Sequence, residues 1–531
     1  MAQAWRRSGP KVKTGCKTCK IRRIKCDELK PSCSKCTSTG RKCDGYANPI
    51  AGFHAQVWSA REKSSPGKHL PQLWVSDEGA RYLEFYHHCA QPMLSSNFDR
   101  GFWSCTTLQM ACTEPAVRHA LIALGYLHST EDGSMKHARS SFASQRESEI
   151  LLRHYNKSVR SLADRMSEAT YTPEIGLVTC LLFVCIEFLR GNYHTAFTHL
   201  TNGLKLISAH GCSDRHDSVA TMCSKRRENV PKAPNLSMST LMKEELVPLF
   251  NRAIASAMMY GVPVEDFMPM HVPSLQHYQN LLFRNIRELE LSAHELRNQS
   301  ILLVRIVSRK LFFLPDMKFT KEEMLEQENM LACQHAWFDA MTRFQNTHQL
   351  SDTDDLVIST TLTHWYAINI WTACIPTTKQ MGFDDHLPAF QMILHHSGRI
   401  LDSMGHKPRG NAARFSFEIS VIPSLYFVAH RCRCPTTRRE ALSLLERKPP
   451  REGLWDAQQH AMVVRRIIEI EEAELDPAKH WPVARTRLWS SVIDANMDHR
   501  GGFWAYFMRT EALHARKGLD KPTLMQEFFV M

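Results

Sequence analysis

The strongest constraint on the fold of this chain is a cluster of six cysteines between positions 16 and 43. The spacing C-x2-C-x6-C occurs twice there, which predicts two similar halves related by an approximate two-fold axis. Six thiolates cannot fill two separate tetrahedral zinc sites, but they suffice if two of them bridge both metals. Thiolates also favour zinc over hard cations such as magnesium. We therefore expect two zinc ions, held by Cys16, Cys19, Cys26, Cys33, Cys36 and Cys43.

A disulfide scaffold is the alternative use of such a cluster. Residues 1–15 lack the apolar stretch of a secretory signal, so a reducing, intracellular setting is expected, and clustered cysteines there favour metal. The longest apolar stretch, around residues 177–189, is interrupted by Thr179 and Glu187. It falls short of the roughly 20 residues that a membrane span needs. We expect a soluble protein with no membrane partner.

Positive charge is concentrated in the same part of the chain. Residues 1–45 contain 13 lysines or arginines against three acids, a net charge of +10, whereas the whole chain carries +12. A local excess of this kind is expected of a nucleic-acid contact, which argues against a zinc module that has only a structural role. For residues 1–15, a solvated tail and a phosphate-contacting or nuclear-import arm both stay open.

The residues between the first-half ligands indicate what the cluster presents to DNA. Residues 20–25, Lys-Ile-Arg-Arg-Ile-Lys, are long enough for about two turns of helix. Ile21 and Ile24 are expected to pack inward against the metals, with the cations projecting outward. A short cationic helix suits the major groove, where Arg and Lys bond to guanine edges. Residues 37–42 carry fewer cations, so structure and phosphate contact are expected of the second half.

This segment resembles the Zn2Cys6 binuclear cluster of fungal transcription regulators. The match includes the run from Cys16 to Cys26 and Pro31 in the loop between the halves. The resemblance implies that Cys16 and Cys33 bridge the two metals, that Pro31 is the loop proline, often cis, and that CGG-like triplets are read. It also implies base contacts, and we expect phosphate contacts beside them. The base-contacting candidates are Arg22 and Arg23, and the phosphate-contacting candidates are Lys17, Lys20, Lys25, Lys35 and Arg41.

The rest of the chain predicts one large helical region. We expect a basic arm at 1–15, the DNA-binding module at 16–44, a Pro- and Gly-rich linker at 45–75 and a helical regulatory region at 76–531 with a loop at 212–239. Apolar residues recur at helical spacing, for example over 324–344 and 458–475, with Thr113 as an N-cap before Pro115. Residues 190–192 predict a turn between two antiparallel helices. The fold class is mainly α, with a small zinc module followed by an all-α domain.

Residues 76–210 also resemble the helical regulatory region found in many of these regulators. The residues that carry this resemblance include Phe102-Trp103 and the run from Phe188 to Tyr193. Family members often dimerise through a coiled coil directly behind the cluster. Residues 45–75 lack heptads, so a homodimer is a candidate partner whose mode stays open.

The expected function is zinc-dependent, sequence-specific regulation of RNA polymerase II genes in the nucleus. The partners are double-stranded DNA and the transcription machinery or co-regulators. No enzyme is expected, because G-x-S-x-G, G-x-G-x-x-G, G-x4-G-K-[ST] and H-E-x-x-H are absent. The alternative is an enzyme or metabolite-binding helical protein with an accessory zinc module. RNA binding is disfavoured, because the cluster lacks aromatic stacking platforms.

Overall fold

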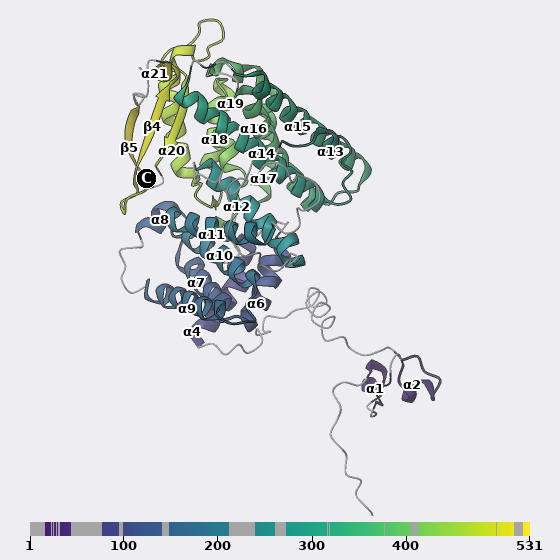
Figure 1. The fold of residues 1–531 in the computed structure, drawn as a ribbon. Coiled ribbons are helices and arrows are strands. Elements are labelled where there is room, and N and C mark those ends of the chain that lie inside the picture. The colour runs from purple at the N-terminus through teal and green to yellow at the C-terminus, as the bar shows by residue number, and fades with distance from the viewer. Residues whose placement is uncertain are drawn as a thin grey trace, which may run out of the picture. The chain divides into compact units, whose positions relative to one another are not determined.

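The computed structural model divides the chain into two compact units, Met1–Gln72 and Leu73–Met531 (Figure 1). The boundaries expected at 15/16, 44/45 and 75/76 stay predictions, because the arm at 1–15 and the linker at 45–75 lie outside the described residues. The loop at 212–239 also lies outside them, except for its last residue. The structure describes residues 16–43 (without 23, 25, 28, 30 and 31), 77–94, 99–140, 148–211, 239–260, 272–315, 317, 319–375, 378–404, 412–494, 496–514 and 524–531.

The small unit contains one short helix in each half of the cysteine repeat. Helix α1 (Lys17–Ile21) begins directly after Cys16, and α2 (Ser34–Thr37) begins directly after Cys33. The equivalent starting points agree with two similar halves. Cysteines alone form the buried centre of this unit among its described residues.

The expectation that Ile21 and Ile24 pack inward against the metals is wrong. Ile21 is 79% exposed and Ile24 is 39% exposed. Helix α1 begins before Cys19 and ends at Ile21, so it covers only the first two residues of the segment 20–25 that was expected to form two turns.

The first part of the large unit is a bundle of helices, which Figure 1 shows in blue and purple at one end of the unit. Helix α7 is buried along nearly its whole length, as its small and aliphatic residues allow. Its N-cap is Glu114 and Pro115 opens it, whereas Thr113, the expected cap, ends the preceding helix. The elements are α4 (Asp77–Phe85), η1 (Tyr86–Ala90), α5 (Gln91–Leu94), η2 (Phe102–Thr106), α6 (Thr107–Thr113), α7 (Pro115–Thr130), α8 (Met135–Ser140), α9 (Ser148–Met166), α10 (Pro173–Leu189) and α11 (Tyr193–Gly211).

The predicted turn at 190–192 is confirmed. It joins the packed pair α10 and α11. Gly191 has a φ of +68°, a backbone conformation that side chains with a Cβ rarely adopt. A Cβ there would also lie 2.7 Å from the Met135 sulfur, so glycine is required for both reasons.

The second part of the unit contains longer helices. Capping boxes start two of them, one between Thr320 and Glu323 and one between Ser351 and Asp354, and each satisfies backbone N–H groups of a first turn. The elements are η4 (Met242–Leu246), α12 (Val247–Met259), α13 (Leu275–Gln279), α14 (Ile286–Phe313), α15 (Lys321–Thr347), α16 (Asp352–Cys374), η5 (Gln380–His386), α17 (Leu387–Ser403), α18 (Ile422–Arg431), α19 (Pro435–Glu446), α20 (Ala457–Glu471), η6 (Ala484–Thr486) and α21 (Thr510–His514).

A three-stranded antiparallel sheet near the C-terminus was not predicted. Its strands are β3 (Leu488–Ile493), β4 (Gly502–Arg509) and β5 (Met525–Val530), with β4 in the centre. The short strands β1 (Phe415–Ser416) and β2 (Arg451–Glu452) pair in parallel. The structure is 71% helical, which confirms the mainly α class. Within the described residues, no helix is long and apolar enough to cross a membrane.

Buried arginines and carboxylates tie the elements of the large unit together. Arg433 and Arg438 both pair with the fully buried carboxylate of Glu471, at 2.9 Å each. In β2, Arg451 donates to the carbonyls of Phe188 and Leu189 at the end of α10. The next side chain, Glu452, accepts from backbone N–H groups at the start of α18. The Arg451 guanidinium thus lies at the partially negative C-terminal end of α10, and the Glu452 carboxylate lies at the partially positive N-terminal end of α18.

Candidate metal centre

Four sulfur atoms of the small unit lie at the spacing of zinc ligands. The Cys16 Sγ is 3.5 Å from that of Cys33 and 3.8 Å from that of Cys36. The Cys19 Sγ is 3.6 Å from that of Cys33. A tetrahedral zinc with bonds of about 2.3 Å separates its sulfurs by roughly 3.8 Å. All six cysteines are free thiols, so the disulfide alternative is excluded in this structure.

The cysteines divide into two sets of four that share two members. Within each set, the sulfurs all lie within 4.8 Å of one another. Cys16 and Cys33 belong to both sets, and they are the pair that the resemblance implied as bridging ligands. Six residues thus supply two tetrahedral sites, which fits two zinc ions. The sets are Cys16, Cys19, Cys26 and Cys33, and Cys16, Cys33, Cys36 and Cys43.

Burial and backbone hydrogen bonds act in opposite directions on the charge of the sulfurs. Burial raises the pKa of Cys16 to about 12 and raises that of Cys19 above its usual value. Zinc binds the thiolate form, so its binding releases the thiol protons. The backbone N–H of Cys19 donates to the Cys16 Sγ at 3.3 Å, and the N–H of Cys16 donates to the Cys26 Sγ at 3.4 Å. Such bonds stabilise sulfur ligands that carry negative charge.

Hydrogen bonds also connect the two halves around the sulfurs. Arg22 is central to them, because its Nη1 donates to the Lys35 carbonyl at 3.2 Å and to the Thr39 hydroxyl at 3.3 Å. The Asp27 carboxylate accepts from the backbone N–H of Ser34 at the start of α2. These roles were not predicted from the sequence, because the positions of Arg22 and Asp27 indicate only that both side chains are exposed.

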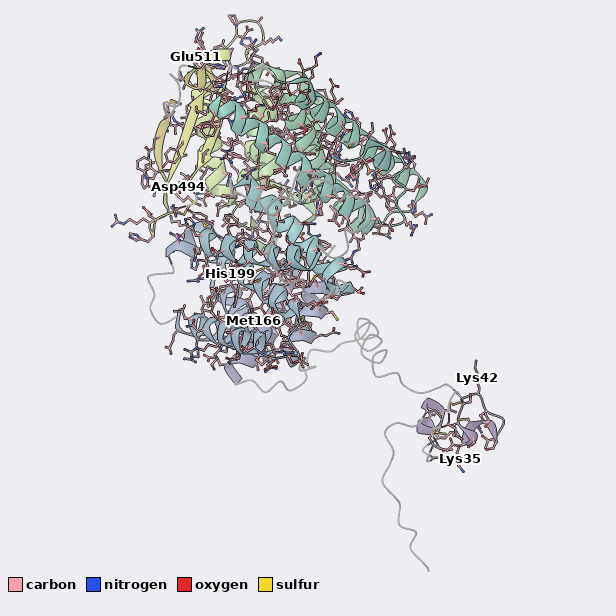
Figure 2. The ribbon with its side chains drawn as sticks, in the orientation of Figure 1. Lys35, Lys42, Met166, His199, Asp494 and Glu511 are labelled. Atoms are coloured by element: carbon pink, nitrogen blue, oxygen red, sulfur yellow. The ribbon has the colours of Figure 1, made fainter. Side chains whose placement is uncertain are left out.

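The candidate DNA contacts fall into three groups. Lys35 and Arg41 are exposed, and Figure 2 shows Lys35 on the surface of the small unit. Arg22 is partly buried by its contacts with the second half. The remaining four cations lie outside the residues whose side chains the structure describes: Lys17, Lys20, Arg23 and Lys25. Pro31, expected as the loop proline, also lies outside the described residues.

Two known domain families match the two units of the chain. Residues 14–51 match the fungal Zn(2)-Cys(6) binuclear cluster domain, which contains all six cysteines. Residues 81–234 match the fungal specific transcription factor domain, which includes the bundle from α4 to α11. Both matches agree with the resemblances seen in the sequence. The chain therefore has a two-zinc cluster domain ahead of a helical regulatory region.

The similar proteins that carry a curated name are transcription regulators rather than enzymes. The aspercryptin biosynthesis cluster-specific transcription regulator atnN of Emericella nidulans is 22% identical over 89% of this chain and 90% of that relative. Transcription regulator lscL of Purpureocillium lilacinum is 26% identical over 40% of this chain and 53% of its own length. Transcriptional regulatory protein moc3 of Schizosaccharomyces pombe is 58% identical over 45 residues, which are 8% of this chain and 9% of that relative. No solved structure matches the chain. The chain thus contains a fungal Zn(2)-Cys(6) binuclear cluster domain and a fungal specific transcription factor domain, and it is similar to fungal transcription regulators.

Proposed function

We propose that this protein is a nuclear regulator of RNA polymerase II genes that reads CGG-like triplets in the major groove of DNA through residues 16–43. The observation that carries the proposal is the shared sulfur cluster, whose two ligand sets hold a short helix in each half. The net charge of +10 over residues 1–45 supplies the attraction to phosphates. Family membership supports DNA binding as the use of this surface.

The contacts divide between base reading and phosphate binding. Arg23 is the principal base reader in this proposal. Arg22, whose guanidinium already bonds to the second half, adds rigidity as well as charge. Lys35 and Arg41 are exposed and suit phosphate contact, with Lys17, Lys20 and Lys25 completing the set. Co-regulators and a second copy of the chain are the proposed protein partners of the helical region.

Selection of random duplexes by the full-length, zinc-loaded chain tests this proposal. We expect enrichment of a CGG-like triplet, and Arg23→Ala should weaken binding to the selected site by about 1–3 kcal/mol and relax one position. Lys35→Ala is the matched control. It should weaken all duplexes equally and lower the dependence of log K on log salt by about 1. A uniform loss for Arg23→Ala, or no enriched motif, contradicts base reading by this residue or by the module.

A further inference from the structure

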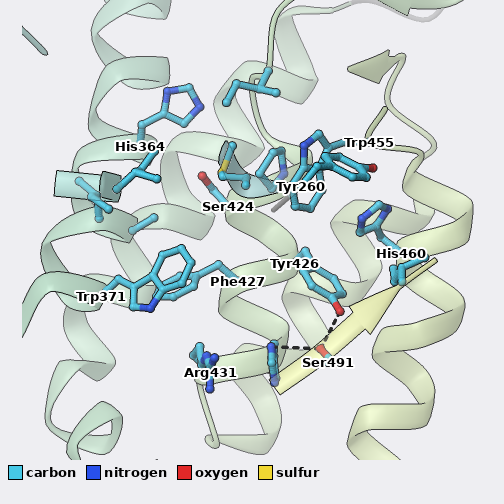
Figure 3. Close-up of a pocket in the computed structure, with 18 of the residues that line it drawn as sticks. Tyr260, His364, Trp371, Ser424, Tyr426, Phe427, Arg431, Trp455, His460 and Ser491 are labelled. Carbon is cyan, nitrogen blue, oxygen red and sulfur yellow. Dashed lines mark hydrogen bonds between the residues drawn. The ribbon is translucent and has the colours of Figure 1, made fainter. Parts of the chain in front are cut away.

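A cavity of about 370 Å³ lies inside the large unit, between its helices and its sheet. Its walls come from α12, α14, α16, α18, α20 and β3, so segments far apart in the sequence meet there (Figure 3). This volume lies in the range of small-molecule sites, about 300–1,000 Å³. None of the residues that bind zinc or that are proposed to contact DNA lines this cavity.

Aromatic rings line two sides of the cavity. Trp371 of α16 and Phe427 of α18 lie with their ring centroids 5.8 Å apart on one side. On the other side, Trp455 lies 4.7 Å from the His460 ring and 5.2 Å from that of Tyr260. Flat faces on two sides favour a flat, apolar ligand, because aromatic rings gain most from offset or edge contacts with other rings.

The guanidinium of Arg431 lies at one end of the cavity. Arg431 donates from Nη1 to the Gln380 side-chain oxygen at 2.5 Å, and its guanidinium lies over the Phe383 ring. In the described part of the chain it forms no ion pair, whereas its neighbours Arg433 and Arg438 already share Glu471. Burial and the adjacent Arg433 lower the pKa of Arg431 to about 10, and the Glu471 carboxylate raises it in part. Because Arg433 and Arg438 already share Glu471, an anion at this end would give the Arg431 charge a partner of its own.

Polar groups beside Arg431 offer hydrogen bonds to the same ligand end. The Ser491 hydroxyl lies beside the Tyr426 hydroxyl (Figure 3), at 2.8 Å, and 3.3 Å from the His430 Nδ1. Burial holds the pKa of His430 well below its usual range, so this ring is neutral at pH 7. Neutral donors and one guanidinium are the groups that recognise a carboxylate or sulfonate in an apolar pocket.

The second arginine of the lining, Arg297, is less suited to an anionic ligand. Its Nη1 donates to the His364 Nδ1 at 3.2 Å, and the His364 Nε2 in turn donates to the Ser420 carbonyl. The carboxylates of Glu290 and Glu418 lie close enough to raise its pKa against the effect of burial. Two carboxylates thus act on Arg297, whereas Glu471, which raises the pKa of Arg431, is already paired with Arg433 and Arg438.

We propose that this cavity binds a flat aromatic organic anion, with its rings between Trp371 and Trp455 and its acidic group on Arg431. Ligand binding at this site goes beyond DNA recognition and requires no residue of the zinc module. Because the ligand would contact α16, α18 and β3 together, its binding stabilises the packing of these elements.

Two fluorescent probes that differ only in charge test the proposal on the full-length, zinc-loaded chain. 8-Anilinonaphthalene-1-sulfonate is an aromatic anion, and N-phenyl-1-naphthylamine is its neutral counterpart. We expect saturable binding of the anion, one per chain, by fluorescence titration and calorimetry. Arg431→Gln should weaken that binding by at least about tenfold, the equivalent of one charge-assisted hydrogen bond, and leave the neutral probe within about twofold.

Three further variants make the outcome decisive. Arg431→Lys keeps the charge and should recover part of the affinity for the anion. Ala367→Phe fills the cavity and should abolish binding of both probes, while Arg439→Gln, an exposed residue paired with Glu472, should change neither. Equal affinity of wild type and Arg431→Gln for the anion, or binding that survives Ala367→Phe, overturns the proposal. If Arg431→Gln lowers the melting temperature, its weaker binding could reflect partial unfolding. The titrations of Arg431→Lys and Ala367→Phe then decide whether the anion binds in this cavity.

Discussion

Different forces stabilise the fold of each of the two units of this protein. In residues 16–43, the described centre consists of cysteine side chains, and even Ile21 and Ile24 lie at the surface. In the large unit, helices such as α7 and α10 are apolar along nearly their whole length and are buried. A module this small cannot bury enough apolar area to fold, so metal coordination supplies its stability. The large unit folds by burial and has no such need.

The units also treat positive charge differently. The cations described in the small unit are exposed or donate to backbone and hydroxyl groups. The C-terminal helices, in contrast, include arginines whose side chains are buried in the core. Arg433 and Arg438 are fully buried and share one carboxylate, that of Glu471. Exposed cations serve association with an anionic partner, whereas buried ones are tolerated only when paired. The same residue type thus has opposite roles in the two units.

Removal of zinc should show the largest difference in stability between the two units. Structural zinc contributes on the order of 10 kcal/mol per site, so exhaustive chelation should unfold residues 16–43 and abolish DNA binding. The large unit should keep its own melting transition. Hydrogen exchange followed by mass spectrometry reads both units in one sample. Protection of residues 16–43 that survives chelation contradicts metal-dependent folding.

Breaking the buried ion pairs should have the second largest effect, on the other unit. Burial alone would raise the pKa of Glu471, but Arg433, Arg438 and the Leu488 N–H together lower it, so the carboxylate is charged at pH 7. Glu471→Gln leaves Arg433 without its charge partner and Arg438 with only Glu472, 3.6 Å away, and it should cost about 3–5 kcal/mol in the free energy of unfolding. Urea unfolding measures this.

The matched control for that substitution is an exposed pair. Arg465 and Glu446 lie 2.6 Å apart and are 54% and 40% exposed at their side chains. Glu446→Gln should therefore cost no more than about 1 kcal/mol. Zinc affinity should be unchanged in both variants, because neither residue belongs to the small unit. Similar losses in the two variants contradict the distinction between buried and exposed pairs.

Buried histidines should make the large unit sensitive to acid. The ring nitrogens of His128 are sealed without a hydrogen-bond partner in the described part of the chain. Burial, with a contribution from Arg451, lowers its pKa from 6.5 to about 3. Its folded-state pKa lies below its unfolded value, so stability is highest above pH 6.5 and falls as the pH drops toward 3.

His128→Leu should remove this part of the pH dependence. Between pH 6.5 and 5 the wild type should lose about 1.4 kcal/mol per pH unit more than the variant. Urea unfolding at pH 7 and pH 5 gives the comparison. Parallel losses for the two proteins count against a neutral, buried His128.

The smallest expected effect concerns the contact between the halves of the zinc module. Arg22→Ala removes the bonds to the Lys35 carbonyl and the Thr39 hydroxyl, and it should lower the stability of the metal-bound module by about 1 kcal/mol. Competition with a chelator measures the zinc affinity. Arg41→Ala removes one exposed cation and should leave this affinity unchanged. Equal affinities for Arg22→Ala and wild type contradict a structural role for Arg22.

The sequence predicted the features that depend on local spacing. The six ligands were visible because metal coordination needs the cysteines themselves, and the α10–α11 turn was visible because Gly191 has a backbone conformation that other residues avoid. The expected burial of Ile21 and Ile24 was wrong, because helical spacing was assumed where α1 ends at Ile21.

Features that depend on distant contacts were not predictable in the same way. Strand β4, from Gly502 to Arg509, is a nearly continuous run of apolar and aromatic residues, so it shows no alternation, although its aromatic content was an available signal. The pairing of Glu471 with Arg433 joins residues 38 positions apart. The cavity depends on six separate segments. No pattern within a short stretch of sequence predicts such contacts.

The sharing of Cys16 and Cys33 between the two ligand sets makes the module cooperative. Loss of either residue removes a ligand from both metals, whereas loss of Cys26 or Cys43 damages one site directly. A half-module is therefore not a smaller version of the whole, because each half takes a ligand of its metal from the other. During titration with zinc, the population should pass from empty to doubly loaded with little of the singly loaded form. Folding of the duplicated sequence unit should therefore be coupled to the binding of both metals together.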